Sequence, residues 1–390
     1  MRFLKWFFGL FSSYVSSFER KTDKFFQGIK STDNIATIRG KLLSLMQENL
    51  IVVNVWLEKK FKGYTYLSKK VRRKMYEDIG AIKAKLEQEI AEKLVSVDQA
   101  KKEVELSGHE FLEVYAEKIL YIYQIMHFLK PGKYYHYIKT ASFGKLLRDP
   151  NVAKMEGDCN QIVTLYIYLY GLKFDISDLK IKLLPEHVCL HFNGIDIECT
   201  NGEFAHYKED CEVLPVTEII STNLLDLADF REDLQVISDR VMVKSAQLAY
   251  SISSHKELVA KNLEIAYQNI GVGAMKANDF STAVFFLGKL NDKRFLRDAN
   301  HNAAIYYMKS GDFTKARYYA QQTGDSDLLK AVNHNDYAKQ FNQLQDKVAG
   351  VKTLDDAKRQ KYNYQKMLDL AVKMGDLSLQ KSLRETLSKI

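Results

Sequence analysis

The C-terminal third of the chain contains an internal repeat. The segment NDFSTA at 278–283 recurs as GDFTKA at 311–316, which is an offset of 33 residues, and a weaker copy, GDLSLQ, follows at 375–380. Small residues at the crossing of two helices, followed by a short polar turn and an aromatic residue, are typical of helical hairpins stacked in series. We therefore expect an α-helical repeat region over 250–390. The small residues at equivalent positions are Gly271, Ala283, Ala304 and Ala316.

This repeat resembles the tetratricopeptide repeat, a family that stacks helical hairpins into a groove for peptides. The resemblance covers roughly 262–332 and, less completely, 362–388. It implies a protein partner bound through the repeats. The tryptophan and the closing proline of the family pattern are absent here. Repeats that only brace the preceding domain are therefore an alternative.

The remainder of the chain divides at a single clear break. Four prolines among 390 residues, with 46% hydrophobic and 27% charged residues, predict a soluble and mostly helical protein. Apolar residues spaced by three and four predict an all-helical region over 21–130, and LKPGKYY at 129–135 ends it. A helix and several short β-like runs then predict a compact α+β domain over 131–235. One apolar face of the helical region comprises Ile79, Ile82, Leu86, Ile90, Leu94 and Val97.

The N-terminus is amphipathic over residues 1–20. Three interpretations remain open: an interfacial helix on an anionic membrane surface, a secretory signal peptide, and a helix that packs on its own domain. A run of eight basic residues over 59–74 contains no acid and suits phosphates or lipid headgroups, although a solvated face is the alternative. The net charge of +8 permits acidic partners without identifying one.

Several classes of function are not indicated by any motif. The chain has no phosphate-binding loop, dinucleotide fingerprint or nucleic-acid module, so we expect no organic cofactor and no nucleic-acid partner. Its four cysteines form no disulfide framework and no C-x-x-C pair, which indicates reduced thiols and no zinc ribbon. We expect a cytoplasmic protein, peripheral at the inner membrane surface if the N-terminus binds lipid; secretion by a signal peptide is the alternative.

The segment HVCLHFNGIDIECT at 187–200 predicts a β-hairpin with a two-residue Asn193-Gly194 turn. In this register His191 pairs with Asp196, and Glu198 lies diagonal to His187. We expect Asp196, next to the turn, to be reached by water. A shared metal ion is disfavoured, because the histidines are spread along one strand. The expected polar face comprises His187, Cys189, His191, Asp196, Glu198 and Thr200.

A second element supplies a candidate nucleophile. Gly157-Asp158-Cys159 precedes apolar residues at helical spacing, and Gly171 ends that helix. A thiol at a helix N-terminus meets free N–H groups and the positive end of the helix dipole, and both favour the thiolate. With a histidine 28 residues further on and an acid on the next strand, Cys159, His187 and Glu198 provide a nucleophile, a base and an orienting acid.

These motifs resemble the transglutaminase-like superfamily of papain-like cysteine enzymes over about 145–210. The family's Gly-x-Cys is represented by Gly157-Asp158-Cys159, its strand-opening histidine by His187, and its Asp-Pro-Thr with a following Asn-Gly by Glu198-Cys199-Thr200-Asn201-Gly202.

The resemblance implies a papain-like α+β fold with Cys159 as nucleophile, His187 as general base and acid, and Glu198 as orienting acid. Glutamate replaces the family's aspartate and adds a methylene, so Asp196 is the alternative acid. The implied chemistry is acyl transfer or amide hydrolysis on a protein or peptide substrate, as a peptidase, amidase or cross-linker, without an organic cofactor. A catalytically inactive scaffold that binds proteins through the repeats is the alternative.

Overall fold

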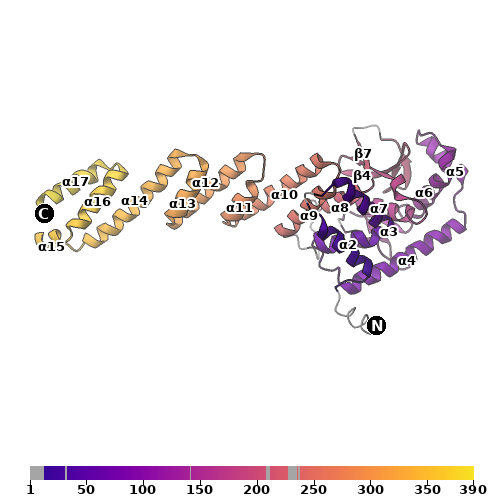
Figure 1. The fold of residues 1–390 in the computed structure, drawn as a ribbon, viewed down its shortest axis with the longest axis horizontal. Coiled ribbons are helices and arrows are strands. Elements are labelled where there is room, and N and C mark those ends of the chain that lie inside the picture. The colour runs from indigo at the N-terminus through magenta and orange to yellow at the C-terminus, as the bar shows by residue number, and fades with distance from the viewer. Residues whose placement is uncertain (1–12, 31–32, 141, 208–210, 227–234, 236–237) are drawn as a thin grey trace. The chain divides into compact units, whose positions relative to one another are not determined.

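The computed structural model describes the chain except for residues 1–12, 31–32, 141, 208–210, 227–234 and 236–237. The fold is mixed α+β and mostly helical (Figure 1). It divides into two compact units, residues 1–266 and 267–390. Strands occur in the first unit, whereas the described part of the second is helical.

Helices dominate the start of the first unit. The helix expected to carry Leu94 and Val97 on its apolar face is shorter than predicted, because α4 ends at Ala91 and α5 begins at Val97. Leu94 and Val97 are accordingly exposed rather than part of that face. The helices are α2 (Ser17–Gly28), α3 (Ile35–Phe61), α4 (Lys69–Ala91), α5 (Val97–Leu106) and α6 (Ala116–Phe128).

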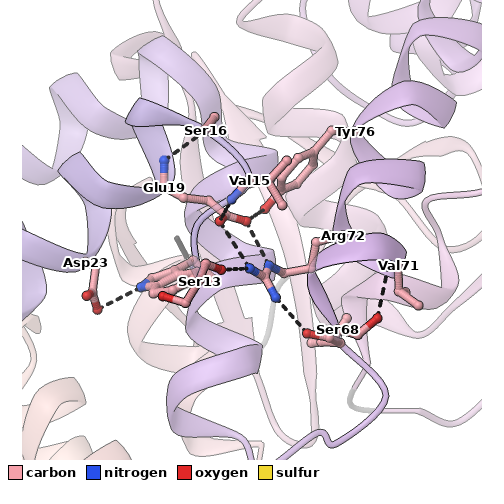
Figure 2. A network of polar contacts seen from close by, with 11 residues as sticks. Ser13, Val15, Ser16, Glu19, Asp23, Ser68, Val71, Arg72 and Tyr76 are labelled. Carbon is pink, nitrogen blue, oxygen red and sulfur yellow. Dashed lines mark hydrogen bonds and ion pairs between the residues drawn. The ribbon is translucent and has the colours of Figure 1, made fainter. Parts of the chain in front are cut away.

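The expected N-terminal helix is only partly present among the described residues. Residues 1–12, which carry most of its apolar face, lie outside them. Within 13–16 the chain is not helical, because Ser16 caps α2 by accepting from the Glu19 N–H at 3.1 Å. The Glu19 carboxylate in turn accepts from Val15 N–H at 2.6 Å. The Ser16 cap starts the helix at Ser17, and the Glu19 carboxylate holds the residue before the cap against the first turn (Figure 2).

Part of the basic run at 59–74 is buried, which corrects the expectation of a solvated face. Arg72 is 2% exposed and its guanidinium lies 2.8 Å from Glu19 Oε1, with further bonds to the carbonyls of Leu67 and Ser13 (Figure 2). Lys62 is also 2% exposed. Two of the eight cations therefore serve the interior of this unit rather than an outer surface.

A five-stranded sheet follows, with strand order β6-β5-β4-β3-β7 and antiparallel neighbours throughout. The predicted hairpin is confirmed: β4 pairs with β5 with His191 opposite Asp196, and Asn193 and Gly194 take positive φ angles of 47° and 89°. A separate parallel pair joins β1 and β2. The strands are β1 (Tyr135–Tyr137), β2 (Met155–Gly157), β3 (Lys180–Leu184), β4 (His187–Phe192), β5 (Ile195–Glu198), β6 (Glu203–Ala205) and β7 (Glu212–Pro215).

One hydrophobic cluster spans the first unit. It joins side chains from the helical region, such as Leu42 and Ile125, to Ile162 of α7 (Cys159–Tyr170) and Ile197 of β5. Helix α7 contacts β4 and also α3, α6 and α8 (Glu218–Leu225). The regions distinguished in the sequence as 21–130 and 131–235 thus share one core, and α7 lies within it.

The second unit is built from consecutive helices that contact their neighbours in the chain (Figure 1). In each copy of the repeated motif a residue with positive φ ends one helix and an aspartate caps the next: Asn278 with Asp279, Gly311 with Asp312, and Gly375 with Asp376. The helices are α10 (Lys256–Lys276), which enters from the first unit, α11 (Phe280–Leu287), α12 (Lys293–Ser310), α13 (Phe313–Thr323), α14 (Ser326–Val348), α15 (Leu354–Arg359), α16 (Lys361–Met374) and α17 (Leu377–Lys389).

The small residues of the repeat are at helix crossings. Ala283 is fully buried in a cluster with Leu287 of its own helix and Ala274 of α10. Ala304 and Ala316 meet in a separate cluster between α12 and α13. Among the described residues, no helix has both the length and the apolar character to cross a membrane.

Candidate active site

The site is built around the first turn of α7, which begins at Cys159 and ends at Tyr170, as predicted. Asp158 is its N-cap: the carboxylate accepts from Asn160 N–H at 3.0 Å and from Gln161 N–H, and the Gln161 side chain accepts from Asp158 N–H. This capping box leaves the Cys159 thiol at the positive end of the helix dipole. Cys159 is a partly buried free cysteine.

The peptide before the nucleophile is also held in place. The carbonyl of Gly157 accepts from the Tyr135 hydroxyl at 2.9 Å and from Ile138 N–H at 3.1 Å. Gly157 has no room for a side chain, since a Cβ there would lie 2.9 Å from Leu146 Cγ. The glycine of the motif is therefore required by close packing.

His187 connects the thiol to a carboxylate. It opens β4, and its Nε2 lies 2.6 Å from Oε2 of Glu198 on β5. The imidazole also interacts with the Cys159 thiol, and both residues line the same cleft. The hydrogen bond to Cys159, then that to Glu198, raise the pKa of His187 to about 10 against the opposing effect of burial. The three predicted residues are thus brought together as a chain of polar contacts.

Glu198 is 3% exposed and accepts several hydrogen bonds. Burial alone would raise its pKa, but hydrogen bonds from His187, Thr200 and Tyr207 outweigh that effect and lower it. The Tyr207 hydroxyl donates to Oε2 at 2.6 Å, and the Thr200 N–H donates to Oε1 at 2.9 Å. A carboxylate held this firmly remains ionised and keeps the imidazole in one orientation.

Asp196, the alternative acid, does not contact His187 in this arrangement. The expectation that water reaches it is wrong, since it is 2% exposed. Its carboxylate lies 2.6 Å from Lys182 Nζ and 2.8 Å from His191 Nδ1. Lys182 comes from β3, so its side chain reaches across β4 over the polar face of the hairpin. Cys189, placed on the same face, is likewise fully buried.

A cleft of about 880 Å³ opens above Cys159 and His187. This volume suits a small ligand or a short stretch of peptide. The cleft is lined by the turn between β3 and β4, the N-terminal end of α7, the C-terminal end of α8 and the first turn of α10. Its lining includes the apolar side chains of Leu184, Leu225 and Leu258.

Two acids on the α7 side of the cleft were not anticipated from the sequence as members of the site. Asn160 Nδ2 lies 2.7 Å from both carboxylate oxygens of Asp226, which follows α8. Burial, and secondarily the charge of Asp226, raise the pKa of Asp158 to about 7. An aspartate directly before a helical pattern indicates an N-cap, so the sequence could have predicted this role for Asp158. Nothing local in the sequence connects Asp226 or Tyr207 with Cys159.

No family model, curated protein or solved structure matches this chain. Within the described part of the chain, no three His, Cys, Asp or Glu side chains are grouped so that they could hold a metal ion.

Proposed function

We propose that the first unit is a cysteine-dependent acyltransferase or amide hydrolase of the transglutaminase-like type, acting on a protein or peptide substrate. The observation that carries this proposal is the continuous chain of contacts from Glu198 through His187 to Cys159, at a helix N-terminus that opens into a cleft. Three features support the proposed roles: the Glu198 carboxylate is buried, it contacts the His187 imidazole, and Cys159 lines the cleft.

The proposed reaction begins with the sulfur of Cys159 as thiolate and His187 as imidazolium. The sulfur attacks the carbonyl carbon of an amide, and the new S–C bond creates a tetrahedral intermediate. Its collapse breaks the C–N bond, and His187 gives its proton to the leaving amine. Water or a second amine then attacks the thioester, His187 takes the proton of that nucleophile, and the thiolate is restored.

Selective alkylation tests the proposal. Iodoacetamide at neutral pH should modify Cys159 well before the other three cysteines, because the imidazolium and the helix N-terminus both stabilise negative charge on its sulfur. Peptide mapping by mass spectrometry identifies the modified residue. Cys189 and Cys199 are buried, so the informative comparison is with the partly buried Cys211, and His187→Ala should slow the labelling of Cys159 to about the rate of Cys211. Equal, slow labelling of Cys159 in the wild-type chain and in His187→Ala would instead favour the inactive scaffold.

Partner binding through the second unit is a separate proposal. Support comes from large aromatic side chains that stay exposed on consecutive helices, although the small residues of the repeats are buried. Phe285, Tyr306 and Tyr318 are 60%, 42% and 56% exposed.

Peripheral membrane association is also proposed, on residues 1–18 with the basic run. Deleting 1–12 should abolish salt-sensitive binding to anionic vesicles; unchanged binding would exclude that role.

A further inference from the structure

Acyl transfer at Cys159 creates an oxyanion that needs hydrogen-bond donors. The first amide of α7, the Cys159 N–H, is one donor, since Asp158 caps the next two amides rather than this one. A single amide is less than such sites ordinarily supply. A second donor therefore has to come from another residue of the cleft, close to the helix start.

Tyr137 lines the cleft beside the strand that leads into the helix start. It is the last residue of β1, and in the parallel ladder with β2 it stands opposite Gly157, two residues before the nucleophile. Tyr137, Cys159 and His187 line the same cleft. The ladder is anchored by the two hydrogen bonds to the Gly157 carbonyl, so the position of this tyrosine relative to the helix start is fixed by backbone pairing.

The phenol of Tyr137 is available as a donor. Its side chain is 44% exposed, and among the described residues its hydroxyl has no hydrogen-bond partner. Burial in the cleft, and then the negative charges of Cys159 and Asp158, raise its pKa above the ordinary value for tyrosine. The hydroxyl consequently stays protonated at neutral pH and can donate.

We infer that Tyr137 is a further catalytic residue, whose hydroxyl donates to the oxyanion of the tetrahedral intermediate together with the Cys159 N–H. This rests on the proposed function of Cys159. Lys139 also lines the cleft, two residues further along the same segment. Lys139 is exposed, and its strongly hydrated ammonium is carried on a flexible side chain. The Tyr137 ring has only two side-chain torsions and its backbone is paired with β2, so its hydroxyl is the better positioned donor.

Two reagents separate oxyanion stabilisation from thiol activation. With p-nitrophenyl acetate, the sulfur of Cys159 bonds to the acetyl carbon, the carbonyl oxygen becomes an oxyanion, and the ester C–O bond breaks to release p-nitrophenolate with its electron pair. With iodoacetamide, sulfur displaces iodide from a saturated carbon and no oxyanion forms. A donor to the oxyanion affects the first rate alone.

The experiment measures both rates for the wild-type chain, Tyr137→Phe and the matched control Tyr250→Phe, whose tyrosine is 39% exposed and does not line the cleft. Tyr137→Phe should slow acetylation of Cys159 by about 100-fold. Its alkylation by iodoacetamide should stay within about twofold of wild type, because the thiol and His187 are unchanged. Tyr250→Phe should change neither rate.

Each other outcome overturns the inference. Unchanged acetylation in Tyr137→Phe would show that the hydroxyl does not reach the oxyanion. A parallel fall in both rates would assign Tyr137 to positioning of the thiol or to folding. If wild-type Cys159 reacts selectively with neither reagent, the proposed function fails and the inference fails with it, a result that differs from failure of Tyr137 alone.

Discussion

Lys182 on β3 holds Asp196 on β5 across the intervening strand, with Nζ 2.6 Å from Oδ2 and both side chains buried. The ammonium also donates to the Tyr207 carbonyl at 3.0 Å, and Tyr207 N–H donates to Asp196 at 3.0 Å. The Asp196 carboxylate is therefore occupied by Lys182 and Tyr207. Glu198, one step further along the same strand face, is left to contact His187.

The two acids should therefore give opposite mutant phenotypes. Glu198→Gln should lower acetylation of Cys159 by p-nitrophenyl acetate by two or more orders of magnitude, about the effect expected when an orienting carboxylate is lost. Asp196→Asn should leave that rate nearly unchanged in the folded protein but destabilise the first unit by about 3–5 kcal/mol, because Lys182 stays buried without a carboxylate. Reaction rates and urea unfolding of both variants measure the difference; the reverse ranking would make Asp196 the orienting acid.

Asp158 predicts a pH dependence of stability. Its folded-state pKa of about 7 is higher than the usual 3.8. The stabilising contribution of its protonated form is therefore fully present below about pH 4 and is lost as pH rises through about 7. The wild-type chain should lose on the order of 3–4 kcal/mol of unfolding free energy between pH 4 and 8. Asn is also a good N-cap but carries no charge, so Asp158→Asn should not show this loss. Denaturant unfolding of both proteins across this range provides the comparison; identical pH profiles would contradict the assignment.

Two glycines of α10 form a matched pair that tests the repeat packing. A Cβ on Gly271 would overlap Leu287, lying 2.5 Å from Cδ2, whereas a Cβ on Gly273 meets nothing within 4 Å. Gly271→Ala should destabilise the second unit by ~1–3 kcal/mol through overpacking. Gly273→Ala should stabilise the helix by up to ~1 kcal/mol, because alanine loses less backbone entropy. Thermal melts monitored by circular dichroism distinguish them, and equal effects would argue against this helix crossing.

Adjacent arginines test the buried pair between α2 and α4. Arg72→Ala leaves Glu19 buried without its counter-ion and should cost about 3–5 kcal/mol of stability. Arg73 is exposed, so Arg73→Ala should change stability by less than about 0.5 kcal/mol. Urea unfolding of the two variants checks this contrast. A small effect of Arg72→Ala would mean that Tyr76 and Val15, which also bond Glu19, suffice to hold its carboxylate.

Local signals predicted the elements that carry the site. The bounds of α7 follow from an aspartate cap, apolar spacing and Gly171, and the hairpin register follows from Asn193-Gly194; all act within a few residues. The contact between His187 and Glu198 followed from that register. The burial of Asp196 could not be predicted in this way, because Lys182 and Tyr207 reach it from other strands and loops.

Charge patterns were less informative than apolar patterns. The basic run was interpreted as one surface, yet Arg72 is engaged by Glu19, which lies 53 residues earlier in the chain. A sequence pattern does not reveal which cation has such a partner. Three interpretations were open for residues 1–20, and charge and apolar spacing did not choose between them. The contacts of Tyr14 agree with packing on its own domain: its ring packs on Trp56 and its hydroxyl donates to Asp23 at 2.6 Å.

The hydrophobic side chains of the two units are connected differently. Among the residues that the structure describes, the first unit has one cluster reaching from Phe26 to Val259, whereas the second has three separate clusters, each formed by neighbouring helices of the chain. Damage in one cluster of the second unit is therefore confined to adjacent hairpins, while damage in the first is shared by every element around α7. Evolution can lengthen, shorten or resurface the repeats with little consequence for Cys159, whereas changes beneath Cys159 are constrained by the whole first unit.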